Sequence, residues 1–252
     1  MNQHLSQIDF DPALRPGAFN AVNVCLRLQP EERLTLITDE ATSEIAAALV
    51  SEIEKVGSRY TVFVLENLMP RPLVHMPPAI LDDLQKSDVS ILANITQSGE
   101  LPSRREMTNV VNRHKIRHAH MVNINKQIMR EGMGADFNLV DELSMKLVEK
   151  ARTTKVIRAQ SDGGTDIEAE LSPSLEWLKT SGIISPDKWG NLPGGEIFTS
   201  PYNLNGVFVV DGVVGDYLCQ KYGDLEQTPL TIEIVNSRIK DLQCANKELL
   251  TE

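Results

Sequence analysis

The amino-acid sequence predicts an α/β protein. An N-terminal layered α/β domain with a mainly parallel sheet is expected over residues 1–153, and a partial, mostly β second domain over residues 154–252. In the first part, strand-like runs alternate with helical patterns of about 10 to 18 residues, a spacing that favours parallel pairing. In the second part, short alternating runs follow one another, and ten of the fifteen glycines lie between Gly163 and Gly223.

The elements of the first part follow from the spacing of its apolar residues. Residues 40–57 place Ile45, Leu49 and Ile53 at helical spacing, and Gly57 follows where a helix C-cap is expected. Strands are expected over 32–39, 59–65, 88–95 and 117–124, and the other helices over 79–87, 103–114 and 136–152. No glycine-rich phosphate-binding loop follows any of these strands, so the layout resembles a nucleotide-binding domain without its phosphate chemistry.

The second part reads as a series of β-hairpins. Residues 154–160 and 165–171 flank the turn SDGG, whose residues tolerate positive φ. Further strands are expected at EIFTSP and over 205–214, and residues 230–244 predict a hairpin that turns at Asn236 and Ser237.

Charge and composition limit the classes of partner. The chain has 252 residues, 41% of them hydrophobic, and a net charge of -10, which argues against nucleic acid because binding it needs a clustered positive field. No segment has the length and apolar character of a signal peptide or a membrane span, so we expect a cytoplasmic protein without a membrane partner. The three cysteines lie far apart and are expected to be buried free thiols.

Two histidines and one glutamate are the residues considered for metal chemistry. His118 and His120 alternate along an expected strand and so project from one face, but no third ligand is expected near them, and a structural role is favoured. Glu196 lies in NLPGGEIFTSP, between a double glycine and an apolar run. Spacing alone favours a surface glutamate on a tight hairpin; the alternative is a carboxylate presented to a ligand on a rigid strand.

The motif NLPGGEIFTSP, with the preceding GGTDIEAEL hairpin and the following NGVFVVDG strand, resembles the metallo-aminopeptidases of the aminopeptidase T, aminopeptidase S and PepS group. The resemblance is more specific from Gly163 to Asp211 than in the α/β part. It implies an enzyme that releases N-terminal amino acids from peptides, a homodimer, and a centre of two zinc, cobalt or similar ions. Glu196 matches a metal ligand of that centre.

The other ligands of that family are a second glutamate, a histidine and a His-x-Asp pair, which lie further toward the C-terminus than residue 252. No histidine follows His120 here. The sequence is therefore expected to be either a fragment or a relative that has lost its metal site, and the fragment is favoured. Two alternatives stay open: an iron-dependent ring-opening dioxygenase of the dihydroxypyridine type, and a non-catalytic dimeric protein that binds a small molecule.

Overall fold

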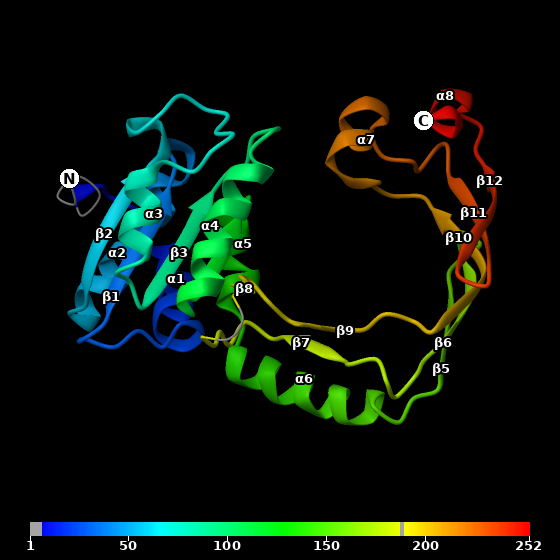
Figure 1. Ribbon diagram of the computed structural model, residues 1–252, viewed down its shortest axis with the longest axis horizontal. Coiled ribbons are helices and arrows are strands. Elements are labelled where there is room, and N and C mark those ends of the chain that lie inside the picture. Colours follow the sequence, from blue (N-terminus) through cyan, green and yellow to red (C-terminus); the bar gives the residue numbers. More distant parts are fainter. Residues whose placement is uncertain (1–6, 187–188) are drawn as a thin grey trace. The chain divides into compact units, whose positions relative to one another are not determined.

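A five-stranded parallel sheet forms the centre of the first of two units in this chain (Figure 1). The computed structural model describes residues 7–186 and 189–252. The first unit comprises Met1–Lys146 and Lys179–Ile197, and the second comprises Leu147–Leu178 and Phe198–Glu252. The strands of the parallel sheet are, in spatial order, β2 (Arg59–Val64), β1 (Arg33–Thr38), β3 (Val89–Asn94), β4 (Arg117–Val122) and β8 (Gly190–Asn191).

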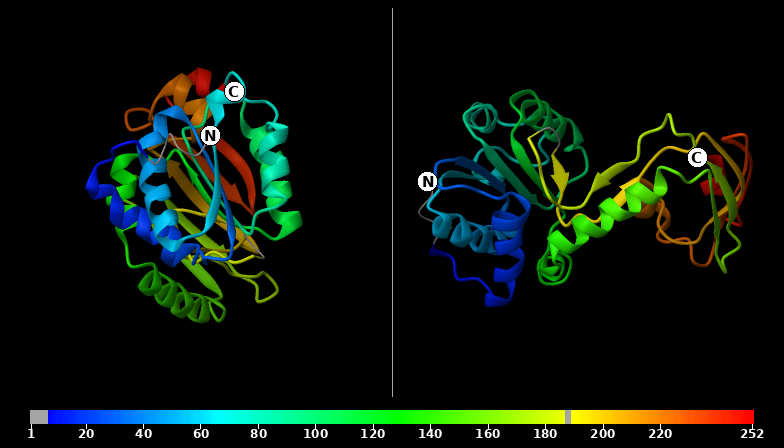
Figure 2. Two further views of the ribbon diagram at one scale, coloured as in Figure 1. Left: turned by 90° about the vertical axis from the view of Figure 1, so that its left-hand side faces the viewer. Right: turned by 90° about the horizontal axis from the view of Figure 1, so that it is seen from below.

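Helices cover both faces of this sheet, with α1 and α2 on one side and α3 and α4 on the other (Figure 2). The helices up to residue 151 are α1 (Arg15–Phe19), α2 (Ser43–Val56), α3 (Pro78–Leu84), α4 (Leu101–His114), α5 (Lys126–Arg130) and α6 (Phe137–Ala151). Short 3₁₀ turns, and one π-helical segment at η3, connect them: η2 (Pro12–Leu14), η3 (Asn20–Cys25), η4 (Glu40–Thr42), η5 (Leu65–Asn67) and η6 (Gly132–Gly134).

Because successive side chains of a strand point to opposite faces of the sheet, the core is divided into two clusters, one on each face. In β3, Ile91 contributes to the cluster that includes α2, whereas its neighbour Leu92 contributes to the cluster that includes α3 and α4. All six residues of β3 are buried, as expected for a central parallel strand that is covered on both faces.

The second unit is built on an antiparallel five-stranded sheet. Its strands are, in spatial order, β12 (Arg238–Gln243), β11 (Leu230–Val235), β10 (Asn203–Val210), β6 (Asp166–Glu170) and β5 (Val156–Gln160). Two short helices, α7 (Gly215–Tyr222) and α8 (Lys247–Thr251), belong to the same unit. A separate two-stranded sheet pairs β7 (Leu178–Thr180) with β9 (Glu196–Phe198).

The predicted fold class is confirmed: a layered α/β domain with a parallel sheet is followed by a β-rich part. Gly57 ends α2 in the left-handed conformation with φ 82°, and Asn236 and Ser237 form the expected turn with φ 50° and 60°. The domain limits 1–153 and 154–252 stay a prediction; contacts within the chain group residues 179–197 with the first unit. Within the described residues, no helix combines the length and apolar content required to cross a bilayer.

Candidate functional site

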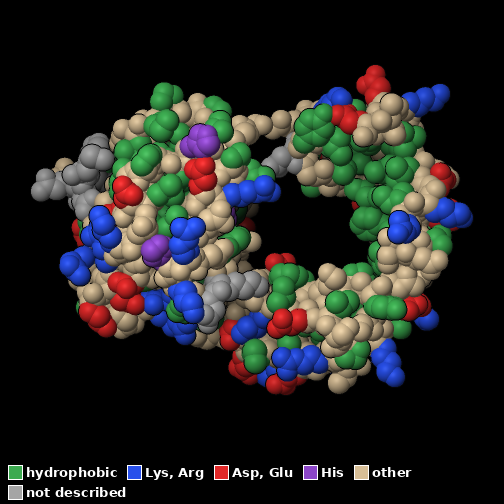
Figure 3. All heavy atoms as spheres, in the orientation of Figure 1, with side chains coloured by type: hydrophobic (Ala, Val, Ile, Leu, Met, Phe, Trp, Pro, Cys, Tyr) green, Lys and Arg blue, Asp and Glu red, His purple; other side chains and the backbone are tan. Residues whose placement is uncertain are grey.

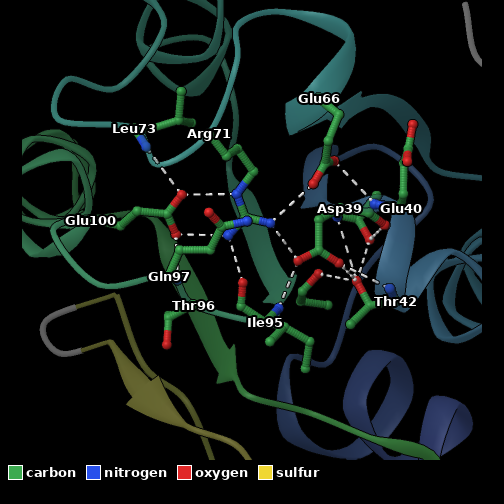
Figure 4. Close-up of polar contacts among 12 residues, drawn as sticks. Asp39, Glu40, Thr42, Glu66, Arg71, Leu73, Ile95, Thr96, Gln97 and Glu100 are labelled. Carbon is green, nitrogen blue, oxygen red and sulfur yellow. Dashed lines mark hydrogen bonds and ion pairs between the residues drawn. The ribbon is translucent and has the colours of Figure 1, made fainter. Parts of the chain in front are cut away.

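A buried polar cluster lies at the carboxyl edge of the parallel sheet, where ligands usually bind in α/β folds (Figure 4). Asp39 directly follows β1, and its Oδ2 accepts hydrogen bonds from Arg71 Nη1 at 2.8 Å and from the backbone N–H of Ile95 at 2.7 Å. Its Oδ1 accepts from the backbone N–H of Thr42 at 2.9 Å. The Asp39 side chain is 0% exposed and the Arg71 side chain 5% exposed, so this is an ion pair shielded from water.

Glu100 binds the other side of the Arg71 guanidinium through a bidentate contact. Glu100 Oε1 accepts from Arg71 Nε at 2.8 Å, and Oε2 accepts from Nη2 at 2.7 Å. Burial raises the pKa of Glu100, but the Arg71 hydrogen bond and the backbone N–H groups of Gln97 and Leu73 outweigh it and hold that pKa below its ordinary value. The Glu100 contact is also the largest cause of the raised pKa of Arg71.

Glu66 completes the cluster and joins the segment after β2 to it. Arg71 Nη1 donates to Glu66 Oε1 at 3.0 Å, while Glu66 Oε2 accepts from the backbone N–H of Glu40 at 3.0 Å. Arg71 therefore ties together the segments that follow three strands, and the carboxylate oxygens are engaged by donors of the chain itself. Such an arrangement suits a structural role better than metal binding, which requires free lone pairs.

One buried hydrogen-bond acceptor at the same edge of the sheet lacks a partner. Asn94 Oδ1, at the end of β3, is buried and has no hydrogen-bond partner among the described residues. A donor from water or from a small ligand would fit there, since buried acceptors are normally paired.

His118 and His120 lie together on one face of β4, as the sequence predicts. His118 Nε2 and His120 Nδ1 are 3.2 Å apart, His118 Nδ1 lies 2.8 Å from Ser90 Oγ, and the Trp189 ring packs near both imidazoles. Burial lowers the pKa of His118 well below its ordinary value, with a smaller contribution from His120. Burial and the nearby Arg104 lower the pKa of His120 to about 4, so both rings are neutral at pH 7.

Glu196 is the first residue of β9 and is exposed. Its Oε1 accepts a hydrogen bond from Thr180 Oγ1 of β7 at 3.1 Å, and the N–H of Gly195 donates to the Thr180 carbonyl at 2.7 Å. The carboxylate is thus held on a paired strand, next to a side chain that orients it.

The double glycine before Glu196 has a packing function. A Cβ atom at Gly194 would lie 2.5 Å from the backbone nitrogen of Gly182 and 2.9 Å from its Cα, so only glycine allows the two backbones to approach. Gly195 has φ 148°, which also favours glycine. These residues therefore place the β9 strand against its neighbour, and Glu196 follows directly.

A pocket of about 290 Å³ lies beside Thr180 in the first unit, close to the lower size limit of small-molecule sites. The charged side chains that line it are Arg27, Asp141 and Lys179. Asp141 accepts from Lys179 Nζ at 2.5 Å and from the Ser181 hydroxyl. Burial raises the pKa of Asp141, but these two hydrogen bonds outweigh it and lower the pKa overall.

The described residues do not fit a complete metal centre. No three His, Cys, Asp or Glu side chains of residues 7–186 and 189–252 come together as ligands, and the contact partner of Glu196 is a threonine hydroxyl. A zinc site needs three or four ligands, and a two-metal site needs more. The described residues alone therefore do not hold a catalytic metal.

The cluster around Arg71 is not among the sites that the sequence predicts. One signal for Asp39 is present, because it directly follows a buried strand at the edge where parallel sheets bind ligands. Arg71 and Glu100 lie in connecting segments without a motif, so their meeting depends on the tertiary fold.

Solved structures that share this fold include two enzymes. One is 2,5-dihydroxypyridine dioxygenase from Pseudomonas putida KT2440, with 15% identity and a TM-score of 0.66; the match covers 96% of this chain and 72% of that chain. The other is AmpT, an aminopeptidase T from Thermus thermophilus, with 14% identity and a TM-score of 0.63 over 96% of this chain and 74% of that chain. No protein-family description and no curated protein matches the sequence. At these identities the likeness concerns the fold.

Proposed function

We propose that this chain is a homodimeric protein of the metallo-aminopeptidase type, in which Glu196 is a ligand of a divalent metal centre that acts on the N-terminus of peptides. The observation that carries the proposal is the position of Glu196 in NLPGGEIFTSP, on a paired strand with its carboxylate oriented by Thr180. The shared fold with AmpT supports it. Zinc, cobalt or a similar ion would polarise a scissile carbonyl in such a centre.

The second candidate function is ring-opening oxidation of a dihydroxypyridine, supported by the fold shared with the dioxygenase. The two functions differ in metal chemistry. A dioxygenase of this type uses one iron ion, whereas the aminopeptidase uses two ions that activate water. Glu196 favours the peptidase, because a mononuclear iron centre does not require that ligand.

The first test is the activity of the 252-residue chain itself. Because the described residues supply too few ligands, we expect no turnover of a leucine chromogenic substrate with added zinc or cobalt, and fewer than two metal equivalents bound per chain. Turnover by this chain, or two bound equivalents, would contradict the ligand assignment.

The second test supplies the missing ligands. A chimera joins this chain to the part of AmpT that the structural match does not cover, and it is assayed with the leucine substrate and with 2,5-dihydroxypyridine. We expect peptidase activity that falls by at least about 100-fold in Glu196→Gln, since loss of a residue that only hydrogen-bonds a metal ligand already costs about 10–100-fold. Glu168→Gln, which changes a partly buried glutamate on β6 that pairs with Arg158, is the matched control. A folded chimera that oxidises the dihydroxypyridine and leaves the peptide intact would select the second function.

A further inference from the structure

Two buried polar atoms near the carboxyl edge of β3 have no hydrogen-bond partner among the described residues. One is Oδ1 of Asn94, a residue that is 2% exposed, and the other is Nε of Arg104 on α4. Asn94 lies two residues after Leu92 on β3, so its side chain points to the same face of the sheet, which α3 and α4 cover. Buried polar atoms are normally paired, so two unpaired ones in one region indicate a ligand.

The helix geometry places Arg104 over this edge of the sheet. Arg104 precedes the buried residues Met107 and Val111 by three and seven positions, so it lies on the side of α4 that faces the sheet. Because α4 connects the parallel strands β3 and β4, it runs back along the sheet and its first turns lie near the carboxyl edge (Figure 1). Burial, and after it the charge of Arg104, lowers the pKa of His120, so the guanidinium lies within electrostatic reach of that ring.

The Arg104 guanidinium is available to an anion. Basic side chains lie on the surface of the first unit around α4 (Figure 3), and Arg104 itself is partly exposed. Glu100, four residues earlier, is bound by Arg71 and does not neutralise it. No ion pair within residues 7–186 and 189–252 holds the Arg104 side chain, so it can turn toward an incoming carboxylate.

A chain of hydrogen bonds determines which nitrogen of His120 carries the proton. Ser90 is 0% exposed, and in the described part of the chain its hydroxyl contacts only His118 Nδ1, at 2.8 Å, so it donates to that nitrogen. The proton of neutral His118 is then on Nε2, which donates to His120 Nδ1 at 3.2 Å. The proton of neutral His120 is therefore on Nε2, on the side of the ring away from His118, where it is a free donor.

We propose that Arg104, His120 and Asn94 together bind a small hydroxycarboxylic acid at the carboxyl edge of β3 and β4. The guanidinium and the Nε2–H of His120 donate to the carboxylate, since the planar guanidinium matches a carboxylate in a bidentate contact. Asn94 Oδ1 accepts from the hydroxyl of the ligand. The Trp189 ring, 5.0 Å from the His120 ring, packs against its carbon atoms. All of these residues belong to the first unit, and the site requires no metal, so it does not depend on the function proposed for Glu196.

A hydroxyl fits this site better than an ammonium group. Asn94 Oδ1 is a single acceptor, and an ammonium group has three N–H donors, two of which would stay unpaired. An ammonium group would also add a second positive charge close to Arg104, and like charges in a partly buried site repel each other. An α-amino acid is therefore expected to bind more weakly than the corresponding hydroxy acid.

The test compares lactate, propionate and alanine, which differ only in the hydroxyl, hydrogen or ammonium group on C2. The 252-residue chain carries Trp177→Phe, so that NMR of the single indole N–H follows Trp189. Lactate is expected to bind with a Kd of about 0.1–1 mM. Propionate is expected to bind at least about 10-fold more weakly, because it leaves Asn94 Oδ1 unpaired. Equal affinity for lactate and propionate, tighter binding of alanine, or no binding of lactate at about 10 mM overturns the proposal.

Matched variants then test the assigned contacts, with circular dichroism to establish that each is folded. Arg104→Met is expected to weaken lactate binding at least about 10-fold, whereas Arg105→Met, which changes its exposed neighbour on α4, leaves it unchanged. Asn94→Val is expected to abolish the preference for lactate over propionate. If Asn94→Val does not fold, the two arginine variants and the three ligands still decide. Equal lactate binding by Arg104→Met and Arg105→Met, or a folded Asn94→Val that still prefers lactate, overturns the site.

Discussion

Replacing Arg71 by methionine tests whether the cluster at the carboxyl edge holds the first unit together. The substitution keeps an unbranched apolar side chain but removes the guanidinium, and it leaves the Asp39 and Glu100 side chains, 0% and 3% exposed, without their cation. Breaking a buried ion pair costs about 3–5 kcal/mol. The backbone N–H groups that still donate to both carboxylates place the expected loss near 3 kcal/mol, a large share of a typical stability of about 5–15 kcal/mol.

The measurement is urea unfolding followed by tryptophan fluorescence. The chain has two tryptophans, and Trp177→Phe leaves Trp189 as a reporter of the first unit. With a slope of about 2 kcal/mol per molar urea, the loss lowers the midpoint by about 1.5 M. Lys146→Met removes an exposed ion pair with Glu142 and is expected to cost less than about 1 kcal/mol.

The pH dependence gives a second readout of the same cluster. Because the folded-state pKa of Glu100 is lowered from 4.5, its contribution to stability is present above pH 4.5 and is lost as the pH falls through the folded-state pKa. The difference between wild type and Arg71→Met is therefore expected to shrink in acid. If Arg71→Met and Lys146→Met unfold at the same urea concentration at pH 7, the structural role of the cluster is refuted.

Two further predictions concern the first unit. The pKa of buried His120 is lowered from 6.5 to about 4, so the folded state is expected to lose up to about 3 kcal/mol of stability as the pH falls from 6.5 to 4. Calorimetry should therefore show that stability depends less on pH in His120→Gln than in the control His114→Gln. Gly194→Ala is expected to destabilise the unit by about 1–3 kcal/mol because its Cβ meets the Gly182 backbone, whereas Gly134→Ala, with no atom within 4 Å of its Cβ, should be nearly neutral in thermal unfolding.

Local signals in the sequence were sufficient to predict the alternating helices and strands of the fold. The burial of β3 and the glycine cap of α2 depend on residues that are neighbours in the chain, and both are present. The close approach of Gly194 and Gly182 depends on residues 12 positions apart and on the path of the loop between them. The Arg71 cluster depends on contacts between segments up to 56 positions apart, such as Asp39 and Ile95, which no local pattern encodes.

The Arg71 cluster also bears on where a ligand can bind. The strand order β2-β1-β3-β4 reverses between β1 and β3, and the carboxyl ends of these two strands are where doubly wound folds usually bind ligands. Here Asp39 after β1 contacts the backbone of Ile95 after β3, and Arg71 donates to both the Asp39 carboxylate and the Ile95 carbonyl. The chain's own guanidinium thus lies between the segments that follow these two strands. Metal chemistry is therefore better sought at Glu196, an exposed carboxylate whose oxygens are not enclosed by such a network.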